Sequence, residues 1–265
     1  MKTTNFKGGK IYTVPLSDIG YIGYFYAKNG KEEIKSARTR ITKERGRAPD
    51  FLMNAELFDF STRKAASDVV SNGVIHRLTE GYGFAFPGNT TAVFSYKNNV
   101  GADDYIGAYP TLVRNGKAES INPAGITGRR GRTALGLGNG NLHVALLPDK
   151  GGATLAELRR AFIKAGAENA INLDGGGSTQ FYAPLGNHRS GRSVRGYIGI
   201  WLKTRADYRT VKVRTSLNIR SGAGVLNKRV GKLYNGDVVN VLEEKNGWCR
   251  VASGWVSSLY LRKQG

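Results

Sequence analysis

NLDGGGST, residues 172–179, is the stretch that best indicates the fold of this 265-residue chain. The short apolar run from Ala170 to Leu173 predicts a buried strand that ends at the Asp174 carboxylate. Three consecutive glycines then allow a tight turn whose N–H groups converge, a geometry suited to phosphate or another anion. The P-loop ending GK[ST] and the G-x-G-x-x-G spacing are both missing. Taken alone, the stretch fits a structural turn with a surface aspartate equally well.

The segments on either side of this turn alternate between strand and helix patterns. Thr154 and Glu157 form a capping box, apolar residues recur at helical spacing, and Gly166 stands at the stop position, so a helix is expected over 154–165. Alternating residues predict a strand at 142–147, and YIGIWLK, residues 197–203, predicts a last strand.

The N-terminal half also alternates between strand and helix patterns, with a larger number of predicted strands. Strand-like residues occupy 11–26, and a helix is expected over 31–47 because Ile34, Ala37 and Ile41 recur at helical spacing. Further short strands are expected at four apolar runs: 51–53, 84–86, 92–94 and 111–113. The predicted fold class is therefore α+β, a β-rich domain with a few helices.

From Val211 onward the pattern changes to short strands with glycine-rich turns every few residues, typical of a small all-β barrel. The boundary is expected near 204–210. We divide the chain into a catalytic domain at 1–206 and a barrel at 207–265.

The net charge of +20 and pI near 10.1 predict a surface that attracts polyanions, which could be nucleic acids or the phosphate-rich glycans of cell walls. Cys249 is the only cysteine, which excludes a disulfide framework and a cysteine-based metal site. No signal-peptide pattern and no run of 18 apolar residues occurs. We therefore expect synthesis in the cytoplasm without a membrane span, and action at the cell wall or outside the cell.

Two more polar clusters are candidates for chemistry. TGRRGRT contains Arg129, Arg130 and Arg132, any of which could pair with phosphate oxygens, although most arginines in such runs are simply solvated. NAELFD, residues 54–59, places three polar groups just after an apolar run, where a core-edge turn is the alternative. The three histidines lack metal-ligand spacing and are interpreted as structural or surface residues.

Together these segments resemble the phosphodiester glycosidase family, which includes the lysosomal uncovering enzyme, N-acetylglucosamine-1-phosphodiester α-N-acetylglucosaminidase. The resemblance covers roughly residues 10–203. It rests on NAELFD at 54–59, AYPTLVRNGK at 108–117, R-T-A-x-G at 132–136, TLAEL at 154–158, AINLDGGGST at 170–179 and R-x-V at 192–194. Ala55 and Glu56 stand where the family usually has glycines, and Gly191 replaces an acidic residue often found just before the arginine that is Arg192 here. These departures leave open whether the substrate is the same as that of the characterised relatives.

The C-terminal segment resembles a bacterial SH3 domain. The resemblance rests on LNIRSG at 217–222, GD at 236–237, NGW at 246–248, GWV at 254–256 and YL at 260–261. Such modules generally bind peptidoglycan peptides or wall polymers, which makes Trp248, Trp255 and Tyr260 the candidate wall contacts. We also expect at least one of the two tryptophans to lie in the barrel core.

The resemblance implies hydrolysis of a sugar 1-phosphodiester in a wall or envelope glycopolymer, as in a phage or bacterial lysin. Asp174 is expected to be the base or nucleophile, Glu56 a second carboxylate, and Asn54 a ligand of a sugar hydroxyl. Anion stabilisation is assigned to the guanidinium groups and to polar groups of the turn. The residues expected to bind phosphate or substrate are Arg132, Arg192, Gly175, Gly176, Gly177, Ser178, Thr179 and Asp59.

No cofactor is predicted, and the need for a divalent metal, the sugar, the stereochemistry and the oligomeric state stay open. One alternative is a non-catalytic wall-binding protein, with Glu56 marking lost activity. A less favoured one is nucleic-acid binding, which rests on charge alone because no RRM, helix-turn-helix or zinc pattern is present.

Overall fold

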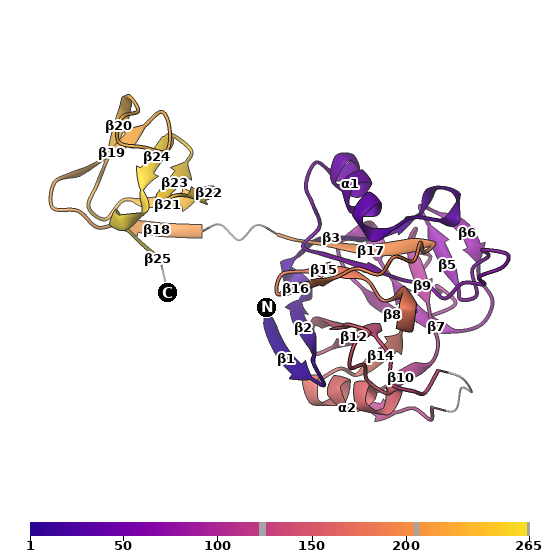
Figure 1. The fold of residues 1–265 in the computed structure, drawn as a ribbon. Helices are drawn as coiled ribbons and strands as arrows, with labels where there is room; N and C mark the ends of the chain where they lie inside the picture. Colours follow the sequence, from indigo (N-terminus) through magenta and orange to yellow (C-terminus); the bar gives the residue numbers. More distant parts are fainter. Residues whose placement is uncertain (122–125, 204–206, 264–265) are drawn as a thin grey trace. The chain divides into compact units, whose positions relative to one another are not determined.

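A computed structural model describes residues 1–121, 126–203 and 207–263 (Figure 1). The chain forms two compact units, residues 1–203 and 204–265. The sequence-based division after residue 206 lies three residues from this boundary, and residues 204–206 are outside the described parts.

The larger unit is built on a seven-stranded antiparallel sheet. In spatial order the strands are β1 (Lys2–Phe6), β2 (Gly9–Pro15), β13 (Asn141–Leu147), β12 (Arg132–Gly138), β14 (Asn169–Asn172), β10 (Thr111–Arg114) and β11 (Lys117–Ala118). β14 is the strand predicted before the glycine turn, and it lies between β12 and β10. Asp174 therefore follows a strand from the interior of the sheet.

Two five-stranded antiparallel sheets complete this unit. One contains β16 (Gly186–His188), β15 (Phe181–Ala183), β4 (Phe51–Asn54), β17 (Gly196–Leu202) and β3 (Ile19–Tyr26). The other contains β6 (Val74–Arg77), β5 (Val69–Ser71), β9 (Tyr105–Gly107), β7 (Tyr82–Ala85) and β8 (Val93–Tyr96). The helical segments are α1 (Ile34–Arg45), α2 (Leu155–Ala165) and the 3₁₀ turns η1 (Leu16–Asp18), η2 (Lys28–Gly30), η3 (Pro87–Asn89) and η4 (Gly176–Ser178).

The main core lies where the inner faces of the three sheets meet, and it includes Val144 of β13, Phe51 of β4 and Phe84 of β7. α2 packs on the other face of the seven-stranded sheet, whereas α1 packs against β4 and β17 (Figure 1). Alternate side chains of these strands are therefore buried on both faces, which explains their continuous apolar runs.

α2 forms where the capping signals predict it. Thr154 Oγ1 accepts the Glu157 N–H at 3.2 Å, and the Glu157 carboxylate accepts the Thr154 N–H at 3.0 Å. Gly166 ends the helix with a φ of 87°. A Cβ at Gly136 of β12 would come within 2.8 Å of the Phe162 ring, so glycine at this strand position is what lets the helix lie close to the sheet.

The smaller unit is all β. One sheet contains β21 (Val238–Val241), β18 (Asp207–Val211) and β25 (Leu261–Lys263). The other contains β20 (Arg229–Tyr234), β19 (Ser216–Arg220), β24 (Gly254–Ser257), β23 (Trp248–Val251) and β22 (Glu243–Lys245), and a 3₁₀ turn, η5 (Ser258–Tyr260), precedes β25. Its core consists of residues between 211 and 261. The predicted fold class, a β-rich domain with few helices followed by a small all-β domain, is confirmed.

In the described parts of the chain, neither helix combines the length and apolar character needed to cross a bilayer.

Candidate active site

The backbone of Asp174 is fixed by three hydrogen bonds with two neighbouring segments. Its N–H donates to Ala55 O at 2.9 Å, and its carbonyl oxygen accepts from Asn54 Nδ2 and Thr133 Oγ1, both at 2.7 Å. Residues 54 and 55 lie at the end of β4, and Thr133 belongs to β12. The ends of strands from two sheets thus hold the aspartate in one place.

Asp174 is a partly exposed residue whose carboxylate lies against the turn that follows it. Oδ1 accepts the Gly175 N–H at 2.9 Å, and the Ser178 hydroxyl also hydrogen-bonds to the carboxylate. Burial nevertheless dominates and raises the pKa of Asp174 from 3.8 to about 6, against the lowering effect of these bonds and of Arg192. A carboxyl group with this pKa can exchange a proton near neutral pH.

The glycine turn does not form the predicted ring of anion-binding amides. Four of the five N–H groups of residues 175–179 donate within the protein: Gly175 to Asp174 Oδ1, Gly176 to Gly131 O, Ser178 to Gly175 O and Thr179 to Gly176 O. The prediction that Gly175, Gly176 and Gly177 bind phosphate together through their amides is therefore wrong. The glycines instead permit tight packing: Gly176 has a φ of 59°, and a Cβ at Gly175 would lie 2.6 Å from Gly131 O.

Arginine side chains flank this turn on two sides. Arg192 Nη1 donates to Ser178 Oγ at 3.1 Å, and its Nη2 would lie 2.9 Å from a Cβ on Gly177. Arg130 is exposed, and its Cδ would lie 3.6 Å from a Cβ on Gly176. Arg192 therefore places positive charge beside the Asp174 carboxylate, and Arg130 places it beside Gly176, while contact of Arg192 with phosphate stays a prediction.

Arg132 lies next to the turn but has a different task from the predicted one. Its side chain is 2% exposed, with Nε donating to Ala153 O at 3.0 Å and Nη2 donating to Ile126 O and Gly128 O, both at 2.8 Å. Burial lowers its pKa from 12.5 to about 10. Arg132 therefore holds together the main chain around the site and does not present its charge to a phosphate.

Glu56 is a buried carboxyl group near the site. It is 2% exposed, its Oε1 accepts a 2.6 Å hydrogen bond from the Tyr24 hydroxyl, and Arg195 Nε lies 3.6 Å from the same oxygen. Burial raises the pKa of Glu56 from 4.5 to about 7, and the charge of Asp174 adds to the rise. Its Oε2 has no hydrogen-bond partner among the described residues. Glu56 can thus influence Asp174 through charge.

The remaining predicted site residues are mostly structural. Asn54 Oδ1 accepts the Gln180 N–H at 3.0 Å while Nδ2 binds Asp174 O, so its amide braces two segments and its contact with a sugar stays a prediction. Asp59 Oδ1 accepts from Ser61 and Thr62 and closes an exposed turn, which lowers its pKa to about 2. Thr179 is fully buried, so it cannot bind phosphate in this structure.

Several residues of the site are not evident from sequence patterns. Tyr24 and Arg195 reach Glu56 from β3 and from the residue before β17. Phe60 is 53% exposed and lies under the Arg192 guanidinium, whose Cζ is 4.5 Å from the ring centroid. The sequence pattern did not mark Phe60, and the structure identifies it because its exposed apolar ring lies beside charged side chains of the site.

The three histidines have contacts of a structural kind. His143 Nδ1 is 3.1 Å from Thr13 Oγ1, His76 stacks on Tyr26 at 4.4 Å, and His188 lies 6.0 Å from the Phe181 ring. Among residues 1–121, 126–203 and 207–263, no three His, Cys, Asp or Glu side chains gather as metal ligands.

In the smaller unit, neither tryptophan belongs to the core, which corrects the expectation that at least one would. Cys249 and Val256 face inward as cross-strand partners, so their neighbours Trp248 and Trp255 lie on the other face of the sheet. Both tryptophans are partly exposed, and Tyr260 is 46% exposed. All three remain candidates for contact with a ligand.

Two carboxyl groups of raised pKa, with an arginine beside the partly exposed one, form a candidate site on a β-rich unit that is followed by a small all-β unit. The chain belongs to the phosphodiester glycosidase family, whose model matches residues 50–201. The bacterial SH3 domain model matches residues 215–262. No curated protein matches the chain.

Solved structures share the fold at low sequence identity. One is the catalytic domain of zebrafish N-acetylglucosamine-1-phosphodiester alpha-N-acetylglucosaminidase, auto-inhibited by its pro-peptide, with 19% identity, a TM-score of 0.57, and 74% of this chain and 77% of that chain covered. A hypothetical protein from Synechocystis has 14% identity and a TM-score of 0.58 over 76% and 61% of the two chains. A putative exported protein from Burkholderia pseudomallei has 12% identity and a TM-score of 0.53 over 73% of each.

Proposed function

We propose that this protein hydrolyses the bond between an anomeric carbon and phosphate in a sugar 1-phosphodiester, in a glycopolymer of the bacterial cell wall or envelope. The observation that carries the proposal is the Asp174 carboxylate, partly exposed, of raised pKa and flanked by Arg192. The family membership supports this reaction class, and the SH3 domain supports a wall-associated substrate.

The proposed reaction is a displacement by water. The water oxygen forms a bond to the anomeric carbon while the bond from that carbon to the phosphate oxygen breaks, and the phosphomonoester leaves with the electron pair. Asp174 takes the proton from the water. A phosphate is already a good leaving group, so neutralising its charge is more useful than protonating it. Arg192 and Arg130 are assigned that task, because a guanidinium group pairs well with phosphate oxygens.

Glu56 is assigned a positioning role, since it is buried and does not face the solvent. When protonated it removes a negative charge from the neighbourhood of Asp174. The Tyr24 hydroxyl and the Arg195 guanidinium hold it in place.

The test compares wild type with Asp174→Asn on a GlcNAc-1-phosphodiester and on purified walls. Asparagine keeps an oxygen for the Gly175 N–H but cannot take a proton, so the turnover number should fall by about a thousandfold with little change in folding. The exposed Asp103 gives the matched control: Asp103→Asn should retain full turnover. In heavy-oxygen water, mass spectrometry should find the label in the released sugar. Label in the phosphate, unchanged turnover of Asp174→Asn, or no sugar release by wild type would overturn the proposal.

A further inference from the structure

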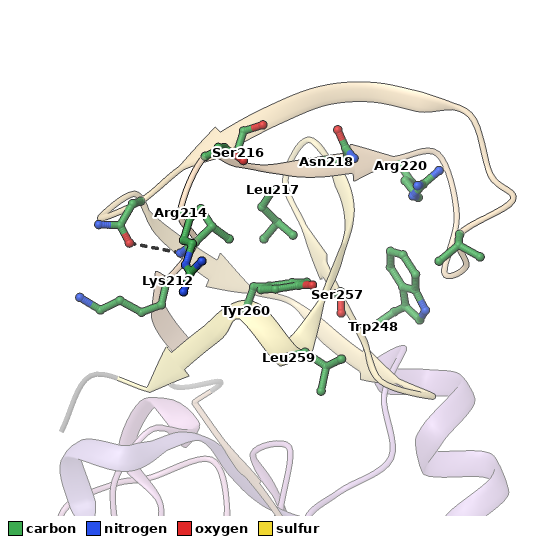
Figure 2. Close-up of a pocket in the computed structure, with 14 residues that line it drawn as sticks. Lys212, Arg214, Ser216, Leu217, Asn218, Arg220, Trp248, Ser257, Leu259 and Tyr260 are labelled. Carbon is green, nitrogen blue, oxygen red and sulfur yellow. Dashed lines mark hydrogen bonds between the residues drawn. The ribbon is translucent and has the colours of Figure 1, made fainter.

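The SH3 unit contains a groove of about 860 Å³, at whose base lies Leu217 of the unit's core. It is bounded by β19, by the strand ends that carry Trp248 and Ser257, and by the 3₁₀ turn η5. Figure 2 shows Lys212 and Arg214 at one end of this groove, Trp248 and Arg220 at the other, and Tyr260 between them. This surface is separate from the Asp174 site and has a chemistry of its own.

The groove combines positive charge with aromatic rings. Three of its lining residues, Lys212, Arg214 and Arg220, are cationic, and the described lining residues include no aspartate or glutamate. Lys212 and Arg214 are exposed, whereas Arg220 is partly buried with Nη1 donating to Asn227 O at 2.8 Å. The unit as a whole (207–265) carries 11 Lys and Arg against 4 Asp and Glu, a net +7. An anionic ligand is therefore favoured over a neutral one.

The aromatic side chains narrow the ligand class. Tyr260 and Trp248 offer apolar ring faces beside the cations, and a sugar ring presents C–H groups that pack on such faces. Side-chain amide and hydroxyl groups of Asn218, Ser216 and Ser257 also line the groove and can bind sugar hydroxyls. A repeating polymer of sugars and phosphates matches both features at once, whereas an uncharged peptide would leave the cations without partners.

We infer that this groove binds a phosphodiester-linked anionic glycan, with Lys212 and Arg214 on the phosphates and Tyr260 and Trp248 on the sugars. The inference rests on the proposed function for one point, namely that the bound polymer is the kind of polymer that Asp174 helps to cleave. Trp255 does not line the groove, so its predicted part in binding is not included. Holding the same polymer at two sites would raise its local concentration at the Asp174 site.

The test measures retention of the full chain on purified Gram-positive sacculi in the Asp174→Asn background, which prevents loss of the polymer through turnover. The sacculi are used intact and after extraction with hydrofluoric acid, which removes phosphodiester-linked polymers and leaves the peptides. Arg214→Glu is compared with Lys263→Glu, which makes the same charge change at an exposed position of the same unit outside the groove. Tyr260→Ala tests the aromatic contact.

The expected result is tight retention on intact sacculi, loss on extracted sacculi, and about tenfold weaker binding for Arg214→Glu and for Tyr260→Ala, with Lys263→Glu close to the parent. Equal retention on extracted sacculi would identify peptidoglycan, its peptides or its glycan strands, as the ligand and overturn the inference. Equal weakening by Arg214→Glu and Lys263→Glu would indicate general charge attraction and would also overturn it. If Asp174→Asn still releases sugar, the proposed function fails, while the binding comparison still decides the groove.

Discussion

The Tyr24 hydroxyl donates a 2.6 Å hydrogen bond to Glu56 Oε1 in the interior of the larger unit. Glu56 stands where the phosphodiester glycosidase family usually has glycine, and in this chain the position holds a buried acid with a hydrogen-bond donor beside it. Arg195 lies on the other side of the same oxygen. Tyr24 of β3 and Arg195, the residue before β17, thus hold the Glu56 carboxyl group in place. Because this carboxyl group is buried, its ionisation lowers the stability of the folded protein.

Glu56 makes folding stability depend on pH. Its pKa is about 7 in the folded protein and near the ordinary value of 4.5 in the unfolded chain, so the folded state binds more protons between these values. The stabilisation is complete below about 4.5 and is lost as the pH rises through 7. Relative to Glu56→Gln, wild type should lose about 3 kcal/mol of unfolding free energy between pH 4.5 and 8. Denaturant titrations at each pH measure this difference, and parallel curves for the two proteins would contradict it.

The rate should depend on the ionisation of Asp174. Because the base must be deprotonated and its pKa is about 6, kcat/KM should fall about tenfold for each pH unit below 6 and level off above it. In Glu56→Gln, kcat/KM should show the same fall below pH 6, since Glu56 is largely protonated at that pH. If kcat/KM of Glu56→Gln no longer fell at low pH, Glu56 would be identified as the base instead.

Phe60 should contribute to substrate binding. Its exposed ring lies against the Arg192 guanidinium, which places an apolar surface next to the proposed phosphate site. Phe60→Ala should raise KM about three- to tenfold with a smaller change in kcat, whereas Phe60→Tyr, which keeps the ring, should stay near wild type. Equal KM values for all three proteins would remove Phe60 from the site.

Replacement of Arg132 should lower the stability of the larger unit, because the Arg132 guanidinium group bonds to the main chain around the site. Arg132→Met leaves the buried Ala153 carbonyl group and two less buried carbonyl groups, of Ile126 and Gly128, without their donor, and should destabilise the larger unit by about 2 kcal/mol. Arg129→Met is the matched change, because Arg129 is exposed and pairs with Glu157 at the surface, where less than about 1 kcal/mol is expected. Calorimetry of the two variants compares them, and equal unfolding temperatures would argue against the bracing role.

Local signals in the sequence predicted local structure well. The capping box of Thr154 and Glu157 and the stop at Gly166 gave the bounds of α2, and the apolar run before Asp174 gave β14. In these cases the physical cause lies within a few residues of the effect. The placement of Asp174 just after a strand is local in the same sense, whereas its catalytic role stays a prediction.

The features of the site that the sequence did not predict depend on contacts between segments far apart in the chain. The direction of the amides in the glycine turn depends on Gly131, and the exposure of Arg132 depends on carbonyl groups at 126, 128 and 153. The pairing of Glu56 with Tyr24 and Arg195 joins segments far apart in the chain. None of these partners is marked by spacing or composition.

The cores of the two units have no residue in common among the described parts of the chain, since the barrel's buried cluster draws only on residues between 211 and 261. Each unit can therefore accumulate substitutions without disturbing the packing of the other. Under the proposed function, exchange of the barrel for one with another ligand preference would bring the same larger unit to a different polymer while leaving the Asp174 site unchanged.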